Sequence, residues 1–325
     1  MGRQGQKSVA LIALLAFLWA APGFGAALSA AQFTRGGLSK AKSVKSGEPA
    51  PRVIVPRPVR LREGRGRGLL VDVWINGTGP YLFAVDTGAG TTVIRSEAFH
   101  RAGLTSTAGS RIAIGGLSNT TSVSGQQTII DDLALGDPGN LLPSHHRVIV
   151  VATLPGGIDG VLDPSEAYAP IGYVIDMPNR QLSAFDTTTS RLQSGNEPAG
   201  GTVVRWVREN DGKRPFVRLG DNRLALIDTG SGFGLAVTYD EIVSGSQRTR
   251  ANSVRDLNGG AVQSRRVAPT TVTIGSLVLR NVPTDILVGA HEDAPVILGR
   301  DALAPFKLTF DPVSRLIEIA PSTQN

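Results

Sequence analysis

Two segments of this 325-residue chain place an aspartate directly after a short apolar run. The sequence LFAVDTG ends in Asp86-Thr87-Gly88, and the sequence LALIDTG ends in Asp228-Thr229-Gly230. A carboxylate at the end of a buried strand is costly to ionise unless it is hydrogen-bonded or paired. One such triplet is a common turn at a strand end. Two of them, one in each half of the chain, indicate a pair of carboxyls that work together.

The chemistry open to such a pair is general acid–base catalysis. Two carboxyls in contact do not both ionise easily, so they share one proton. The charged member can deprotonate a water molecule while the protonated member donates to the carbonyl oxygen of a bound peptide. A tetrahedral diol forms and collapses with cleavage. Gly88 and Gly230 allow a close backbone approach and offer N–H groups to the carboxylates. Thr87 and Thr229 are expected to exchange hydrogen bonds between the two segments.

The elements that must position these residues are predicted to be strands. Residues 69–76 and 81–85 form two strands around the turn at 76–80, and the same order recurs in 214–238. A short helix is expected at 96–102. Each repeat ends with a strand, an Asp four residues before an Arg, and another apolar strand. We therefore predict an N-terminal unit at 66–190, a polar, glycine-rich linker at 191–201 and a C-terminal unit at 202–325.

These segments resemble the active sites of aspartic proteases. Asp86-Thr87-Gly88-Ala89 and Asp228-Thr229-Gly230-Ser231 are similar to the catalytic triplets and the residue after them. The residues around the first triplet resemble those of the retropepsin branch, and the presence of two repeats in one chain resembles pepsin. Taken together, the two repeats are most similar to exported bacterial retropepsin-like proteases. VILGRD, at 296–301, resembles the segment that packs behind the catalytic loop. The resemblance implies an all-β, bilobal fold of two pseudo-symmetric units, with Asp86 and Asp228 catalytic between them.

The remaining expectations about the site also follow from the resemblance. The flap over the cleft is expected at 113–125, where Ile114, Gly115 and Gly116 would contact substrate, and its counterpart in the second unit at 256–266. This flap lacks the tyrosine of pepsin-like enzymes. Asp163 stands where the family has a glycine, which predicts altered geometry behind Asp86. The Ser231 hydroxyl, which Ala89 lacks, is expected to donate to the outer oxygen of Asp228 and to make it the easier to ionise.

The N-terminal residues predict export. Arg3 and Lys7 precede the apolar run at 9–21, and small residues follow at 25–27. The run is short for a membrane span, so residues 1–27 are expected to be a signal peptide, with an uncleaved anchor as the alternative. Residues 28–65 are expected to be a basic, disordered arm that could instead touch an anionic envelope surface. The chain has no cysteine, which fits a secreted or periplasmic bacterial protein.

Composition argues against other functions. Without cysteine, and with His145-His146 as the only histidine cluster, no metal site and no cofactor are expected. The chain from residue 69 onward is mildly acidic, so nucleic acid is not an expected partner. The sequence thus predicts a monomeric aspartic endopeptidase acting on polypeptides. The alternative is a protease-like module that binds peptide or envelope material, with catalysis impaired by the Asp163 departure.

Overall fold

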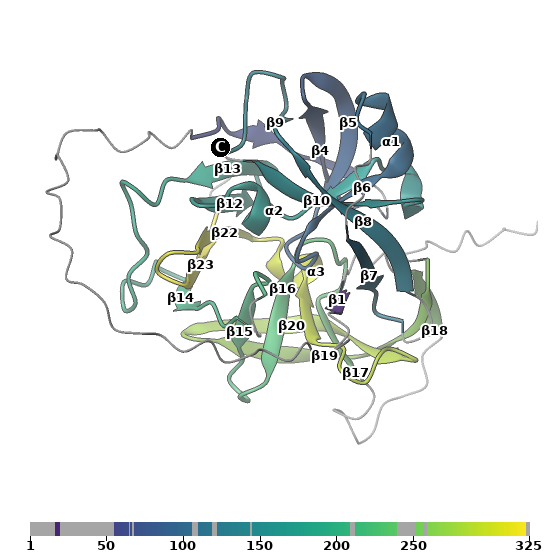
Figure 1. The fold of residues 1–325 in the computed structure, drawn as a ribbon. Coiled ribbons are helices and arrows are strands. Elements are labelled where there is room, and N and C mark those ends of the chain that lie inside the picture. Colours follow the sequence, from purple (N-terminus) through teal and green to yellow (C-terminus); the bar gives the residue numbers. More distant parts are fainter. Residues whose placement is uncertain are drawn as a thin grey trace, which may run out of the picture.

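Three β-sheets make up most of the protein (Figure 1). The computed structural model describes residues 17–19, 55–64, 66, 68–105, 110–118, 122–143, 145–208, 212–238, 251–255 and 259–322. The helical elements of these residues are short: α1 (Ser96–Arg101), α2 (Pro164–Ala167), α3 (Arg300–Leu303) and the 3-10 turn η1 (Pro155–Gly157). The all-β class expected from the sequence is confirmed. None of the described helices has the length and hydropathy that crossing a membrane requires.

The first sheet has ten strands, in the order β1-β7-β8-β10-β6-β11-β5-β4-β3, with β9 paired to β4. The strands are β1 (Phe17–Trp19), β3 (Arg62–Gly64), β4 (Gly68–Ile75), β5 (Thr78–Val85), β6 (Thr92–Arg95), β7 (Arg111–Gly115), β8 (Ser122–Ile130), β9 (Leu133–Leu135), β10 (His146–Val151) and β11 (Gly160–Leu162). The β4–β5 hairpin and α1 lie where the sequence predicted two strands and a helix.

The second sheet has seven strands, all from the C-terminal half, in the order β15-β16-β21-β17-β20-β19-β18. They are β15 (Phe216–Arg218), β16 (Leu224–Asp228), β17 (Leu235–Thr238), β18 (Ala251–Arg255), β19 (Ala261–Ile274), β20 (Leu277–Val288) and β21 (Val296–Gly299). Its longest hairpin, β19–β20, turns at Gly275, whose positive φ of 56° suits a glycine.

The third sheet joins the two halves of the chain. Its order is β14-β23-β22-β12-β13-β2, with β2 (Val59–Arg60), β12 (Gly172–Asp176), β13 (Gln181–Phe185), β14 (Thr202–Arg205), β22 (Phe306–Asp311) and β23 (Leu316–Pro321). Its central pair, β12 and β22, comes from the two repeat ends found in the sequence. Tyr173 on β12 stacks on Phe310 of β22 with ring centroids 4.4 Å apart, so apolar contacts fix the two halves at this sheet.

The same strand pairing recurs in the two larger sheets. In the first, β5 pairs in parallel with β11, and β6 lies antiparallel on the other side of β11. In the second, β16 pairs in parallel with β21, and β17 lies antiparallel to β21. Val85 therefore lies opposite Leu162 as Ile227 lies opposite Leu298. Each Asp-Thr-Gly triplet is thus carried by the end of a strand that a short parallel strand supports.

The N-terminal expectations meet the structure only in part. Residues 28–54 and most of 1–27 lie outside the described residues. The described part of 1–27 is β1, which pairs antiparallel with β7, and the signal peptide stays a prediction. The expectation of a disordered arm up to residue 65 is wrong for residues 55–64. Val59 and Leu61 are buried in the main apolar core, and the Leu61 N–H donates to the Arg180 carbonyl at 2.7 Å. Besides these buried side chains, strand pairing joins β2 to the third sheet and β3 to the first.

Candidate active site

Strands end directly at both aspartates. Asp86 follows β5, and its backbone N–H donates to the Leu162 carbonyl of β11 at 3.0 Å. Asp228 is the last residue of β16 and lies opposite Gly299 of β21. Both side chains are completely buried. The apolar runs before the triplets drive the strands into the core, and this packing carries the two carboxyls with them.

The two threonines hold the triplets together as the sequence predicted. The N–H of Thr87 donates to Thr229 Oγ1 at 3.2 Å, and the N–H of Thr229 donates to Thr87 Oγ1 at 3.1 Å. Each hydroxyl then donates to a carbonyl of the other segment: Thr87 to Ile227 at 2.6 Å, and Thr229 to Val85 at 3.2 Å. Every polar atom of this buried cross-link is satisfied, so the relative position of the two loops is fixed.

Each triplet glycine contacts both carboxyls, its own through a hydrogen bond and the opposite one through close packing. Through the backbone, Gly88 N–H donates to Asp86 Oδ1 and Gly230 N–H donates to Asp228 Oδ1, both at 2.8 Å. Through space, each faces the opposite aspartate. A Cβ on Gly88 would lie 3.0 Å from Cγ of Asp228, and one on Gly230 would lie 2.4 Å from Cγ of Asp86. Any side chain at position 230 would therefore displace the carboxyl, which explains why glycine is needed there.

The residues after the triplets differ, but not in the way that the sequence suggested. The backbone N–H of Ser231 donates to Asp228 Oδ1 at 3.1 Å, whereas its hydroxyl accepts from the N–H of Phe233 at 3.2 Å. The expected bond from this hydroxyl to the outer oxygen of Asp228 is absent, because the hydroxyl is turned toward Phe233. Ala89 is buried among apolar side chains and makes no such bond to Asp86. The extra donor to Asp228 is thus a backbone group.

The two carboxyls have unequal proton affinities. Burial, followed by the nearby charge of Asp228, raises the pKa of Asp86 well above its usual value. Burial also raises the pKa of Asp228, to about 6, while hydrogen bonds from Asp86, Ser231 and Gly230 and the charge of Arg300 oppose that rise. Among the described residues no donor reaches Oδ2 of either aspartate. Asp86 is therefore the member that holds a proton, and Asp228 the member that carries the charge.

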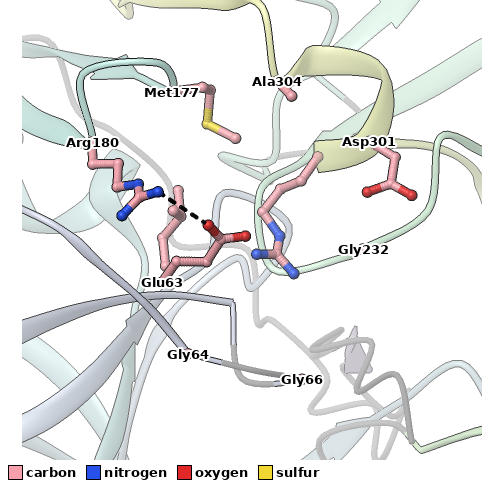
Figure 2. A pocket seen from close by; sticks show the side chains of 10 residues that line it. Glu63, Gly64, Gly66, Met177, Arg180, Gly232, Asp301 and Ala304 are labelled. Atoms are coloured by element: carbon pink, nitrogen blue, oxygen red, sulfur yellow. Dashed lines mark ion pairs between the residues drawn. The ribbon is translucent and has the colours of Figure 1, made fainter. Parts of the chain in front are cut away.

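A cavity of about 540 Å³ lies beside the second triplet. Gly232 and Arg300 line it, and the guanidinium of Arg300 donates to the Ser231 carbonyl at 3.3 Å. Glu63 and Arg180 meet in this cavity, as Figure 2 shows, with 3.8 Å between their charged atoms. The cavity thus places one cation against the loop of Asp228, which accounts for the effect of Arg300 on the pKa of that residue.

The predicted flap forms a hairpin of β7 and β8. Ile114 is buried in the apolar cluster that contains Ala89, so it lies against the loop of the first triplet, and Gly115 ends β7. Gly116 is the next residue and is buried. The counterpart at 256–266 includes the start of β19, which pairs with β18 just before this range, although residues 256–258 lie outside the described part.

Sequence reasoning missed the residue at the tip of this hairpin. Leu117 is completely buried, in an apolar cluster whose other buried members, such as Phe233, all come from the C-terminal half. The N–H of His291 donates to the Leu117 carbonyl at 2.9 Å, and Ser118 pairs with Ala290. The hairpin therefore spans from one half to the other. An apolar residue between a glycine pair and a serine was the available signal, but its partner lies far away in the sequence.

Asp163 takes a defined place behind Asp86. It caps α2, with Oδ1 accepting from the Ser165 N–H at 2.9 Å and from the Ser165 hydroxyl at 2.7 Å. Its own N–H donates to Thr92 Oγ1 at 3.2 Å. The strand pairing of β11 with β5 is intact up to Leu162. The departure from the family glycine is therefore accommodated by a helix cap, and the backbone that supports Asp86 keeps the pairing seen in the other half.

Comparison with known protein families supports this assignment. Residues 71–162 match the family model described as aspartyl protease, which confirms the resemblance seen in the sequence. The matched segment runs from β4 to the end of β11 and includes Asp86 and the hairpin of β7 and β8. No curated protein matches the chain. Across the described residues, no group of three or more His, Asp or Glu side chains is arranged to hold a metal ion.

Proposed function

We propose that this protein, with its aspartyl protease segment at 71–162, is an aspartic-type endopeptidase whose catalytic residues are Asp86 and Asp228. The observation that carries the proposal is the burial of two carboxyls against each other in unlike surroundings, so that one is protonated and the other charged in the same pH range. Hydrolysis of a peptide bond by acid–base catalysis needs one protonated and one charged carboxyl at the same time.

In the proposed reaction, Asp228 acts as base and Asp86 as acid. The Asp228 carboxylate takes a proton from a water molecule as the water oxygen bonds to the peptide carbonyl carbon. Asp86 gives its proton to the carbonyl oxygen, so the product is a neutral tetrahedral diol. The proton on Asp228 then passes to the amide nitrogen, the carbon–nitrogen bond breaks, and a diol proton returns to Asp86. The unpaired Oδ2 atoms of both residues are available to hold the water molecule.

The first test is single substitution of each aspartate. Asp86→Asn and Asp228→Asn should each lower kcat/KM for a mixed peptide library by at least about a thousandfold, since either change removes the shared-proton state. The exposed residue Asp131, changed to Asn, is the control and should retain full activity. Circular dichroism of all three proteins establishes that folding is retained. Near-parental turnover in either dyad variant would exclude the assignment.

A second candidate is a peptide-binding module without turnover. The observation in its favour is that the hairpin tip at Leu117 is packed against the other half while both aspartates are fully buried. Such a module would bind a pepstatin-type inhibitor yet leave a peptide library intact. Binding alone does not separate the two candidates, because binding survives the loss of chemistry, so turnover is the deciding measurement.

The location and assembly of the protein are proposed from the sequence. We propose export to the periplasm or the exterior of a bacterial cell, with residues 1–27 removed, and a monomer as the active form since both aspartates lie in one chain. N-terminal sequencing of the protein recovered from the periplasm tests the first point. A retained N-terminus in the membrane fraction would favour the anchor instead. Light scattering at the concentration used for activity tests the second.

A further inference from the structure

A third carboxyl lies buried behind the dyad and has no part in the proposed reaction. Asp163 is completely buried, and its Oδ2 has no hydrogen-bond partner among the described residues. It follows Leu162, whose carbonyl accepts the backbone N–H of Asp86. The side chain of Asp163 is thus held one residue beyond the strand that supports Asp86, at a position that the helix cap with Ser165 fixes.

The corresponding place in the other half of the protein cannot hold a side chain. Gly299 follows Leu298 of β21 as Asp163 follows Leu162 of β11. A Cβ on Gly299 would lie 2.4 Å from the Phe233 carbonyl oxygen, so a substituent there would clash with backbone. The backbone ψ angle is −170° at Gly299 and 107° at Asp163, so the chain leaves the two strands in different directions. Only Asp86 therefore has an acid behind it.

The groups that face Asp163 come from four elements. Asp86 lies on the loop after β5, Glu166 on α2, Tyr173 on β12 and Lys213 on the segment before β15. Lys213 is committed to Glu166, with 3.8 Å between their charged atoms, and Glu166 also accepts from the Thr91 hydroxyl at 2.9 Å. No cation among the described residues is in ion-pair contact with Asp163, although the nearby charge of Lys213 favours its ionised form, so a charge on its carboxyl also acts on Asp86.

We propose that Asp163 is a positioning residue for the dyad, whose buried carboxylate keeps the shared proton on Asp86 as the solution approaches neutral pH. The inference rests on the proposed function, since it concerns the acid of that reaction. It assigns a role to the residue that replaces the family glycine. In the proposed reaction, Asp163 contacts neither the substrate nor the attacking water and acts only through Asp86.

The pH at which this device operates follows from burial. Desolvation raises the pKa of Asp163 to about 7, against the hydrogen bonds from Ser165, which favour the charged form. Asp163 is therefore neutral in acid and gains its charge around neutral pH. That charge raises the pKa of Asp86. A charge on Asp163 therefore favours the protonated form of Asp86, and the alkaline limit of activity lies at higher pH than it would with an uncharged residue at position 163.

The test compares wild type with Asp163→Asn, which removes the charge and keeps the size. The alkaline limb of the kcat/KM profile should move to lower pH by about half a unit or more, a loss of about threefold on that limb, while the acid limb stays in place. In parallel, the carboxyl carbon of Asp86 is titrated by NMR and should show the same downward shift. An unmoved limb, or one moved to higher pH, in a folded variant would overturn the proposal.

A second variant keeps the test decisive if Asp163→Asn fails to fold. Ser165→Ala removes the hydroxyl bond to Asp163 Oδ1, so Asp163 ionises at higher pH and the limb should move in the same direction by a smaller amount. Ser190→Ala, at an exposed serine, is the matched control and should leave the profile unchanged. The NMR titration also separates two failures. A protein that cleaves nothing but shows the Asp86 shift refutes the proposed function alone, whereas a cleaving protein without the shift refutes the role of Asp163.

Discussion

Single residues around the dyad make the two aspartates unlike. Asp163 lies behind Asp86, while Arg300 lies beside the loop of Asp228. A negative neighbour on one side and a positive neighbour on the other act in the same sense, because the first favours the protonated form and the second the charged form. Because the two triplets are identical in sequence, these outside residues add to the larger effects of burial and of the contact between the two carboxyls in making the aspartates unlike.

A prediction at this scale concerns Ser231. Because its backbone N–H, and not its hydroxyl, donates to Asp228, Ser231→Ala should leave the acid limb of the kcat/KM profile unchanged. The variant should instead lose stability, by about 1–3 kcal/mol, since the buried N–H of Phe233 loses its acceptor. Urea unfolding and a pH–rate profile measure the two effects. A moved acid limb with unchanged stability would mean that the hydroxyl serves Asp228 after all.

The sequence predicts which residues form the site better than it predicts their side-chain hydrogen bonds. The duplicated triplets locate Asp86, Asp228 and the crossed threonine bonds, because local sequence determines where a strand ends and which side chain follows it. The direction of the Ser231 hydroxyl depends on Phe233, which the following loop folds back. The cap formed by Asp163 depends on a backbone turn that differs between the halves. Such details are set by tertiary packing and leave no periodic signal.

At the scale of elements, the hairpin of β7 and β8 links the two halves of the protein beside the first triplet. Its tip inserts Leu117 into the apolar cluster of the C-terminal half and accepts one backbone hydrogen bond from His291. The tip is held by the buried side chain of Leu117, the hydrogen bond from His291 and the pairing of Ser118 with Ala290, and a contact of this size opens at a lower free-energy cost than the sheets do. In the proposed function this hairpin is the flap, so opening at its tip is the local motion that would admit a substrate.

Leu117→Ala should make that opening more frequent. Truncation of a buried leucine costs about 2 kcal/mol or more, which corresponds to about a thirtyfold larger open population. Hydrogen exchange of the His291 amide should accelerate by that factor, while amides of β12 and β22 should keep their rates. Val313→Ala, at an exposed apolar residue, is the control. Equal acceleration across all sheets would show that the variant lowers global stability and that the tip is part of the general core.

A second prediction at this scale concerns the N-terminal edge. A truncated protein that begins at residue 65 lacks Val59 and Leu61, both buried in the core, and the pairing of β2 with β13. It should be about 3–6 kcal/mol less stable than a protein that begins at residue 55, from the apolar area lost. Urea unfolding of the two proteins measures the difference. Equal stability would restore the view that the whole arm up to residue 65 is dispensable.

The basic character of residues 28–65 misled the prediction of this edge because basic and apolar residues alternate there. Val59 and Leu61 point into the core, while Arg60 and Arg62 remain exposed. Averaged over a window, such a strand looks like a solvated basic segment, although its period of two is that of an edge strand with one buried face. The third sheet was also beyond prediction, since its strands come from distant parts of the chain.

At the scale of the whole molecule, buried ionisable groups make stability depend on pH in opposing ways. The buried carboxyls hold their protons more tightly in the folded protein than in the unfolded chain, so their contribution is lost as pH rises through the folded pKa. Burial acts in the other direction on His146, lowering its pKa to about 4, so the contribution of this histidine is lost as pH falls. In wild type alone, the pH dependence of the free energy of unfolding therefore combines the effect of the carboxyls with the opposite effect of His146.

The difference in the free energy of unfolding between wild type and Asp163→Asn isolates the contribution of Asp163. Asp163 has a pKa of about 7 when folded, against 3.8 for the ordinary group, whereas the amide does not titrate. Below pH 4 the aspartate is protonated in both states and contributes no slope. Between pH 4 and pH 7, Asp163 is ionised in the unfolded chain but still protonated in the folded protein. The free energy of unfolding of wild type should therefore fall by up to about 4 kcal/mol relative to the variant. His146 contributes equally to both proteins and cancels. Urea unfolding in half-unit steps from pH 4 to pH 7.5 measures this slope, whatever constant offset the amide introduces. A flat difference would mean that the Asp163 carboxyl ionises in the folded protein as readily as in water, and that its burial is relieved by partners that the described residues do not supply.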